Sequence, residues 1–216
     1  MKTRDKIVYA ALQLFNENGE RNITTNHIAA HLGMSPGNLY YHFHNKQEII
    51  REIFAGYSVE LLEHFTPVDT QQGSLAQLKR YLDSIFTLMW KYRFFYANLP
   101  QILQQDELLQ EKYLAVQEKA KINLHAIFKA FIKLKLLDIK EEEVKIVITS
   151  LHLIISSWLS YQSSLSLKSE ITEQMIRQGM LQMTAMIKPF TTKPGREQLL
   201  LLEEEINSLI DKSDKE

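Results

Sequence analysis

The sequence predicts an all-α protein with a small three-helix head and a larger helical body. Apolar residues recur at helical spacing along the chain, and no segment shows the alternation expected of a convincing strand. Only seven Gly and five Pro interrupt the 216 residues, which favours long helices over many short strands. Hydrophobic residues make up 45% of the chain, enough to fill a core.

The first two predicted helices are delimited by residues suited to helix ends. The first covers residues 3–18 and is followed by Gly19, a good C-terminal cap. The second begins at Thr24, a good N-cap, and stops at Gly33. Apolar residues of the first helix fall on one face, namely Ile7, Ala11, Leu14 and Phe15.

A third, short helix begins only a few residues later. Ser35 is an N-cap residue, and Pro36 suits the first helical position because the backbone N–H there would lack a partner anyway. Leu39 and Phe43 are four residues apart, so both are expected to point inward against the first two helices. Two short helices joined in this way form a helix-turn-helix over residues 24–43, whose second helix enters the DNA major groove.

A fourth helix, over residues 45–65, is predicted to link the head to the body. Asn45 is its N-cap, and Glu48 is expected to reach back to it in a capping box. The breaker-rich residues 66–74 are predicted to form a loop. In the body, Asp138 and Glu141 form another predicted capping pair. The body helices are predicted at residues 74–92, 94–105, 106–136, 141–164, 170–188 and 194–211.

The helix-turn-helix residues form a long string with fixed spacing. The string consists of Thr24, Thr25, Ile28, Ala29, Leu32, Gly33, Met34, Ser35, Gly37, Leu39, Tyr40, His42, Phe43 and Lys46. It resembles the signature of the TetR family of bacterial regulators. The resemblance covers roughly residues 3–60, and the remaining helices match in number, length and topology. It implies a DNA-binding head over residues 1–50 and a helical ligand-binding and dimerisation domain over residues 51–216.

The resemblance also implies which head residues contact DNA. The residues that match phosphate contacts of the family are Thr25, Tyr40, His42 and Lys46. The residues that match the groove-facing set, which alone can read sequence, are Ser35, Gly37, Asn38 and Tyr41. Residues 24–43 contain no Lys, Arg, Asp or Glu. Readout is therefore expected to depend on Asn38, hydroxyl groups and apolar contacts with thymine methyls.

A ligand pocket in the body is one interpretation of its aromatic residues, since helical sensors line pockets with such side chains. The alternative interpretation is a packed bundle core with a helix-breaking corner before Pro100. The candidate pocket residues, including two polar groups, are Phe86, Trp90, Phe94, Tyr96, His125 and Trp158.

A homodimer is expected because a helix-turn-helix protein reads two half-sites with two-fold symmetry. Residues 141–164 are apolar on nearly every face, which requires burial on two sides. Core packing would cover one side and a partner subunit the other. The candidate interface residues are Leu151, Ile155, Met180 and Met183.

Other classes of function find little support in the sequence. Cysteine is absent, and the pair His27 and His31 lacks the carboxylate or Cys ligands that would complete a metal site. No nucleophile with a base, phosphate loop or paired-carboxylate constellation indicates an enzyme or a cofactor. The N-terminus lacks signal-peptide features, and no run approaches the roughly 18 uninterrupted apolar residues of a membrane span. These features favour a soluble cytoplasmic protein without a membrane partner.

The resulting hypothesis is a transcriptional repressor that binds a double-stranded DNA operator. Its affinity for the operator is expected to fall when a small-molecule effector enters the body. The alternative is a helical ligand-binding or scaffold protein whose head no longer reads DNA. The net charge of −1 and the uncharged reading helices keep that alternative open.

Overall fold

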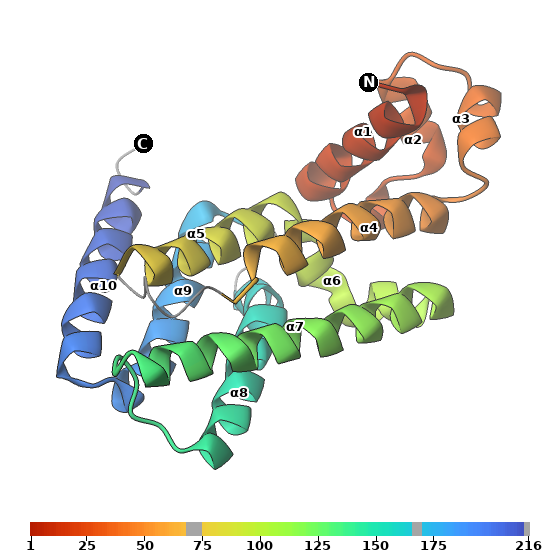
Figure 1. Ribbon diagram of the computed structural model, residues 1–216. Coiled ribbons are helices and arrows are strands. Elements are labelled where there is room, and N and C mark those ends of the chain that lie inside the picture. The colour runs from red at the N-terminus through yellow and green to blue at the C-terminus, as the bar shows by residue number, and fades with distance from the viewer. Residues whose placement is uncertain (68–74, 166–169, 214–216) are drawn as a thin grey trace.

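The computed structural model describes residues 1–67, 75–165 and 170–213, and it confirms the predicted all-α class (Figure 1). Among the described residues there is no strand, only one isolated antiparallel bridge between Leu137 and Thr191. The N-terminal helices are α1 (Thr3–Asn18), α2 (Thr25–His31), α3 (Pro36–His42) and α4 (Lys46–His64), with a 3-10 turn η1 (Glu20–Asn22) after α1. The body helices are α5 (Leu75–Lys91), α6 (Arg93–Gln104), α7 (Glu107–Lys133), α8 (Glu141–Ser164), α9 (Glu173–Ile187) and α10 (Lys193–Ser213), with a 3-10 turn η2 (Lys188–Phe190) before α10.

The helix-turn-helix is fixed by the local signals that predict it. The side chains of Thr24 and Ser35 each accept a hydrogen bond from a backbone N–H in the first turn of α2 and α3. Pro36 occupies the first position of α3, as expected. Gly33 adopts a φ of 64°, a left-handed conformation that lets the chain turn between the two helices.

The start of α4 differs from the predicted capping box in one contact. Asn45 Oδ1 accepts the backbone N–H of Glu48 (2.9 Å), as expected. The Glu48 carboxylate, however, accepts the backbone N–H of His44 (2.8 Å) rather than that of Asn45. The helix ends before Phe65, and residues 68–74 of the predicted loop lie outside the described residues.

The predicted capping pair of Asp138 and Glu141 is wrong. The helix α8 begins after Lys140, whose backbone N–H donates to the carboxylate of Glu143 (3.2 Å). The backbone N–H of Asp138 donates instead to the carbonyl of Phe190 (2.8 Å). This tertiary contact ties the α7–α8 connection to η2, and α8 begins at Glu141, the first residue of the predicted range.

The helix α4 joins the two parts of the molecule. It packs against α1 in the head and against α5 and α7 in the body, whereas α8 packs against α6, α7 and α9 (Figure 1). One hydrophobic core follows α4 from head to body: it includes Ile7 and Leu39 in the head and Phe95 and Leu109 in the body. A second core lies farther from the head, around Phe128 and Val144 and against α9 and α10.

The helix α8 leaves part of its apolar surface uncovered. Among the described helices, it is the one whose length and composition would suffice to cross a membrane. Only 28% of its most apolar window is buried within the chain. One such helix is weak evidence for a membrane span, because a core helix of a soluble protein passes the same test of length and composition.

Candidate nucleic-acid interface and body cavities

The third helix of the head presents the groove-facing candidates on its surface. Ser35, Gly37, Asn38 and Tyr41 are all exposed, and 84% of Tyr41 is accessible. On the opposite face of α3, Leu39 is fully buried and holds the helix against α1 and α2. The prediction that the two tyrosines of α3 lie on the surface is confirmed, since Tyr40 is also exposed.

Two of the expected phosphate contacts lie next to each other. The hydroxyl groups of Thr25 and Tyr40 are 3.2 Å apart, which brings the start of α2 close to the middle of α3. His42 is half-buried, and its ring packs edge-on against Tyr41 at 5.2 Å. Its carbonyl accepts a hydrogen bond from the guanidinium of Arg4 (3.0 Å). We call the hydroxyl and imidazole groups of Thr25, Tyr40 and His42 the polar border of α3.

Lys46, expected to contact phosphate, is paired within the chain in this structure. Its ammonium lies 2.6 Å from the carboxylate of Glu20 and also donates to the backbone carbonyl of that residue (2.9 Å). Only 4% of the Glu20 side chain is accessible, so the carboxylate has a strong need for this partner. Lys46 therefore anchors α4 to η1. The ion pair could not be predicted from the sequence, because the two residues are far apart along the chain.

Other head cations are engaged in the same way. Arg4 pairs with Glu52 (2.9 Å), and its guanidinium covers the ring of Phe43 at 4.2 Å. Arg51 pairs with Asp106 (2.7 Å), the residue that caps α7. Few basic side chains of the head are left for phosphate. Those that are exposed and form no ion pair with a described residue are Lys2, Lys6 and Arg21.

A second connection joins the head to the body beside α4. The side chain of Asn16 donates to the carbonyl of Lys91 (2.8 Å) and accepts the backbone N–H of Phe94 (3.1 Å). The rings of Phe15 and Phe94 pack at 5.2 Å. The end of α1 is therefore fixed to the start of α6. Within α6, Asn98 departs from helical geometry two residues before Pro100, so the helix kinks just beyond this junction.

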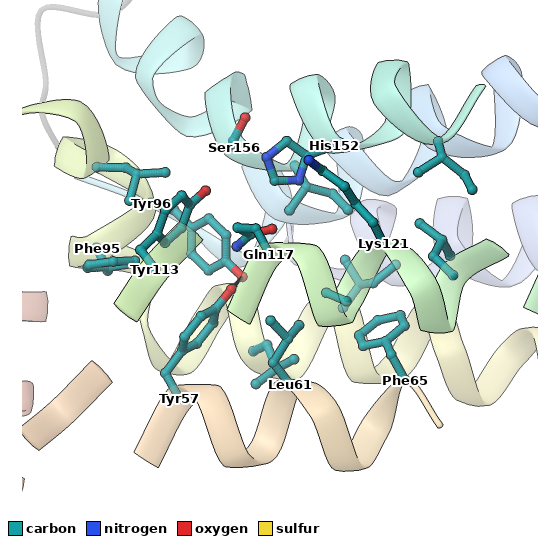
Figure 2. Close-up of a pocket in the computed structure, with 17 residues that line it drawn as sticks. Tyr57, Leu61, Phe65, Phe95, Tyr96, Tyr113, Gln117, Lys121, His152 and Ser156 are labelled. Carbon is teal, nitrogen blue, oxygen red and sulfur yellow. Dashed lines mark hydrogen bonds between the residues drawn. The ribbon is translucent and has the colours of Figure 1, made fainter. Parts of the chain in front are cut away.

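A cavity of about 90 Å³ opens in the body behind that junction, between α4, α5, α6, α7 and α8. We call it the polar cavity. Figure 2 shows Tyr57, Tyr96, Tyr113, Gln117 and His152 directed into the same space. The hydroxyls of Tyr57 and Tyr96 lie 3.0 Å apart in a hydrogen bond. Gln117 is only 9% exposed, and its amide has no hydrogen bond to any residue in the described parts of the chain.

Burial favours the neutral forms of the tyrosines and the histidine that line the polar cavity. Burial raises the pKa of Tyr113 to about 12 and that of Tyr57 further. Burial also raises the pKa of Tyr96, so the three hydroxyls remain protonated and can donate. Burial and the nearby Lys121 ammonium lower the pKa of His152 below its usual 6.5. An uncharged imidazole, an amide and three phenols thus face the cavity.

A second space of about 110 Å³ lies beside the first, between α5, α7, α8, α9 and α10. We call it the apolar cavity, since its lining is almost entirely aliphatic and aromatic and includes no charged residue. The two cavities share four lining residues. These are Phe65, Ile85, Leu124 and Ile155.

Only one of the six predicted ligand residues lines the polar cavity. That residue is Tyr96. The rings of Phe86 and Trp90 are covered by arginine guanidinium groups at 4.2 Å. Phe94 packs against the head instead, and His125 lies half-buried on α7 away from both cavities. Phe86 lines a third space, between α5, α9 and α10, whereas the alternative interpretation of a packed core is the better one for Trp90 and Phe94.

Trp158, the sixth candidate, lines neither cavity. Two residues that do line the polar cavity were not among the candidates, and one of them could have been recognised from the sequence. The Trp158 indole N–H donates to the carbonyl of Met175 (2.6 Å) and joins α8 to α9. The missed residues include Gln117 and His152. Gln117 follows Tyr113 by four residues on the buried face of α7, and a polar residue within such an apolar stripe marks a cavity.

Three predicted dimer residues belong to the core of a single chain. Leu151, Met180 and Met183 are each at most 6% exposed, and Ile155 lines both cavities. A side chain covered by its own chain cannot meet a partner, so these assignments are corrected. The exposed apolar residues of α8 lie on its other face and include Ile146, Leu153 and Tyr161.

Two protein-family models match the chain. The model for bacterial regulatory proteins of the tetR family matches residues 7–53. The model TetR, described as a bacterial transcriptional repressor, matches residues 56–199.

Individual proteins agree with the family models. A crystal structure of a TetR-family transcriptional regulator from Marinobacter aquaeolei VT8 has a TM-score of 0.81 and 36% sequence identity, over 95% of this chain and 99% of that one. The HTH-type transcriptional regulator SrpR of Pseudomonas putida is 35% identical over 66 residues, which span 31% of each chain. The structure of the SmeT–triclosan complex shares the fold, with a TM-score of 0.57 and 18% identity over 88% of this chain and 92% of that one.

The anchoring role of Lys46 leads to a test that separates folding from DNA contact. Lys46→Met leaves a buried carboxylate without its partner, so we expect the free energy of unfolding in urea to fall by about 3 kcal/mol. The double variant Glu20→Gln/Lys46→Met should recover most of that loss. If Lys46 contacted phosphate instead, stability would be unchanged and the slope of log affinity against log salt would become shallower by about 0.9.

The lowered pKa of His152 predicts a pH-dependent stability. The folded state resists protonation while the unfolded chain takes up a proton near pH 6.5, so the free energy of unfolding should decrease as the pH falls below about 6.5. Above that pH, His152 is neutral in both the folded and the unfolded states, so its contribution to the free energy of unfolding is fully present. Urea titrations across this range should show a flatter pH dependence for His152→Gln. The exposed His31→Gln is the matched control, and identical curves for all three proteins would contradict the assignment.

Proposed function

The chain belongs to the TetR family of bacterial transcriptional regulators, and we propose that it is a repressor that leaves its operator when a small molecule enters the polar cavity. Proteins of this family are regulators rather than enzymes. One observation carries the proposal: a cavity lined by polar groups without hydrogen-bond partners among the described residues lies between α4 and α6, the two helices that hold the head. Together with the solvent-facing α3, this arrangement suits a DNA reader controlled from the body.

Ligand binding would act on the head through the walls of the polar cavity. Tyr57 belongs to α4 and Tyr96 to α6, and their hydrogen bond closes one end of the space. A ligand that inserts between them would shift α4 relative to α6, and Asn16 would carry the shift of α6 to α1. The shift is favoured only in so far as the ligand binds the displaced conformer more tightly. In a dimer, the two heads would then no longer match half-sites about one helical turn apart.

For the DNA contacts, we assign the exposed N-terminal part of α3 to the major groove. Asn38 can form a bidentate pair with adenine, while Ser35, Gly37 and Tyr41 lie close enough to shape the rest of the readout. The polar border formed by Thr25, Tyr40 and His42 would contact phosphate and set the register. The domain boundary falls within α4, so that residues 1–50 read DNA and residues 51–216 bind the effector and the partner.

A homodimer is the best explanation for the uncovered face of α8. Ile146, Leu153 and Tyr161 are more than half exposed and follow one another at helical spacing. Beside them, α9 exposes Gln182 and Ala185, which would allow a second copy to approach closely. A two-fold axis through α8 and α9 would bury both copies of this surface. Action on DNA as a soluble dimer implies a cytoplasmic location.

Operator binding is tested by mobility shift with the DNA that flanks the coding region. We expect Asn38→Ala to lower affinity by about 1–3 kcal/mol and to relax the preference at one base pair, because one bidentate contact is lost. Asn207→Ala on α10, exposed and far from the head, is the matched control. A randomised-operator selection that is identical for Asn38→Ala and the unmutated protein would refute the readout assignment. Absence of any specific shift would favour the scaffold alternative.

The dimer is tested by placing a charge on the uncovered face of α8. Leu153→Glu should give monomers in sedimentation experiments, because burying an unpaired carboxylate costs several kcal/mol. Leu114→Glu on α7 is equally exposed but lies off this face, so it should remain dimeric. The monomeric variant should keep its helical circular dichroism spectrum and lose tight operator binding. An unmutated protein that is monomeric at micromolar concentration would overturn the assignment.

A further inference from the structure

We propose that the polar and apolar cavities form one site for an amphiphilic carboxylate with a long, unbranched apolar tail. The head group would bind in the polar cavity, and the tail would extend into the apolar cavity. The inference rests on the proposed function in so far as the polar cavity is the effector site. It goes further by naming the chemistry of the effector.

The two cavities are separated by a single layer of side chains. Phe65, Ile85, Leu124 and Ile155 line both spaces, so each of them has one face on either side. All four are apolar, and none holds the wall in place by a side-chain hydrogen bond. Each cavity alone is small, about 90 and 110 Å³, against ~300–1,000 Å³ for the pockets of drug-sized ligands. Rotation of the wall side chains joins the two spaces into one elongated site.

Phe65 is the wall residue best placed to move. It is the C-terminal cap of α4, where the helix has already ended, and it is half-buried. Its ring stacks on Tyr81 at 5.9 Å, a contact that can slide without breaking a hydrogen bond. A tail passing from one cavity to the other would therefore displace the end of α4, the helix that carries the head.

The polar end of the site fits an anionic head group. Neither cavity is lined by an Asp or Glu, whereas Lys121 and His152 lie side by side on the wall of the polar cavity (Figure 2). Gln117 as a residue is only 9% exposed, and its amide is directed into the cavity and forms no hydrogen bond with a described residue (Figure 2). Lys121 does contact Glu118 (2.7 Å), but both side chains are at least half exposed, so a carboxylate can compete with that weak pair.

The far end of the site is mostly apolar and fits a hydrocarbon tail. Two of its polar side chains, Tyr81 and Thr191, donate their hydroxyls to the backbone carbonyls of Thr66 and Lys188. A third, Gln198, has a buried Oε1 that accepts no hydrogen bond from a described residue. The remaining lining comes mainly from aliphatic and aromatic side chains of five helices. A hydrocarbon chain would fill this space and gain the free energy of leaving water.

The experiment uses calorimetric titration of the full-length protein with a series of straight-chain acids. Hexanoate, octanoate, decanoate and dodecanoate are added below their micelle-forming concentrations. We expect affinity to rise about fourfold per methylene, the factor that corresponds to ~0.8 kcal/mol for each buried CH₂, until the apolar cavity is full. Decyltrimethylammonium, with a tail of similar length and the opposite charge, should bind about tenfold more weakly or not at all.

Two variants separate the head from the tail. Lys121→Met should lower the affinity for every acid by about tenfold and abolish the preference for acids over the ammonium compound. The dependence of affinity on chain length should not change. Lys121→Arg keeps the charge and should bind like the unmutated protein. Leu78→Trp narrows the apolar cavity. The affinity for the acids should therefore stop increasing at a shorter chain length than in the unmutated protein, while hexanoate binds as before. Leu114→Trp, on the exposed surface of α7, is the matched control.

The possible outcomes distinguish failure of this inference from failure of the proposed function. Affinity that does not depend on chain length, or a preference for the ammonium amphiphile, would overturn the two-cavity carboxylate site. If the acids bind as expected but leave the operator complex intact, the inference of a carboxylate site is supported and the proposal that a ligand in this site releases the operator is contradicted. If another small molecule releases the operator and the acids do not bind, release stands and this inference fails.

Discussion

The whole molecule depends on α4 being part of two cores at once. Its first half places Ile49 and Ile53 in the core of the head, and its second half places Tyr57 and Leu61 at the polar cavity. The helix has 19 residues, so these functions are joined by a rod roughly 28 Å long at 1.5 Å per residue. A packed helix moves as a unit because its neighbours are close-packed on every buried side. Any change in the cavity that shifts one end of α4 must therefore reach the other end.

The contact between Asn16 and the start of α6 limits how the head can respond. With α4 alone, the head could rotate freely about a single rod. Two hydrogen bonds and the packing of Phe15 on Phe94 add a second point of attachment. The head is therefore held at two places, through α4 and through the junction of α1 with α6. The kink of α6 at Asn98 separates the attached half of that helix from the half that contacts the body, and both halves line the polar cavity. The cavity thus lies at the place where the two supports of the head can change their spacing.

Sequence reasoning succeeded where the signal is local and failed where it depends on which faces meet. The caps at Thr24, Ser35 and Asn45 were predictable because each acts on the next turn of its own helix. The pair of Lys46 with Glu20 was not, since the turn η1 brings together residues that no periodicity connects. The interface residues predicted from the sequence differ from the exposed ones for another reason. Both faces of α8 are apolar, so the pattern alone cannot tell which one the chain covers itself. The choice between His125 and His152 likewise depends on how α7 and α8 are rotated in the bundle.

The charge distribution of the head favours specificity over general attraction to DNA. Arg4, Lys46 and Arg51 would ordinarily draw the head to phosphate, yet each is paired with a carboxylate of the chain, Arg4 on the surface and the other two in partly buried pairs. Non-specific binding is almost entirely electrostatic, so a head with few free cations spends little time on random DNA. What matters for regulation is the ratio of specific to non-specific affinity, multiplied by the number of competing sites. A reader that depends on Asn38, hydroxyls and an exposed tyrosine can keep that ratio high while its absolute affinity stays modest. Under the proposed function, a modest absolute affinity is also what a ligand of limited binding energy can overcome.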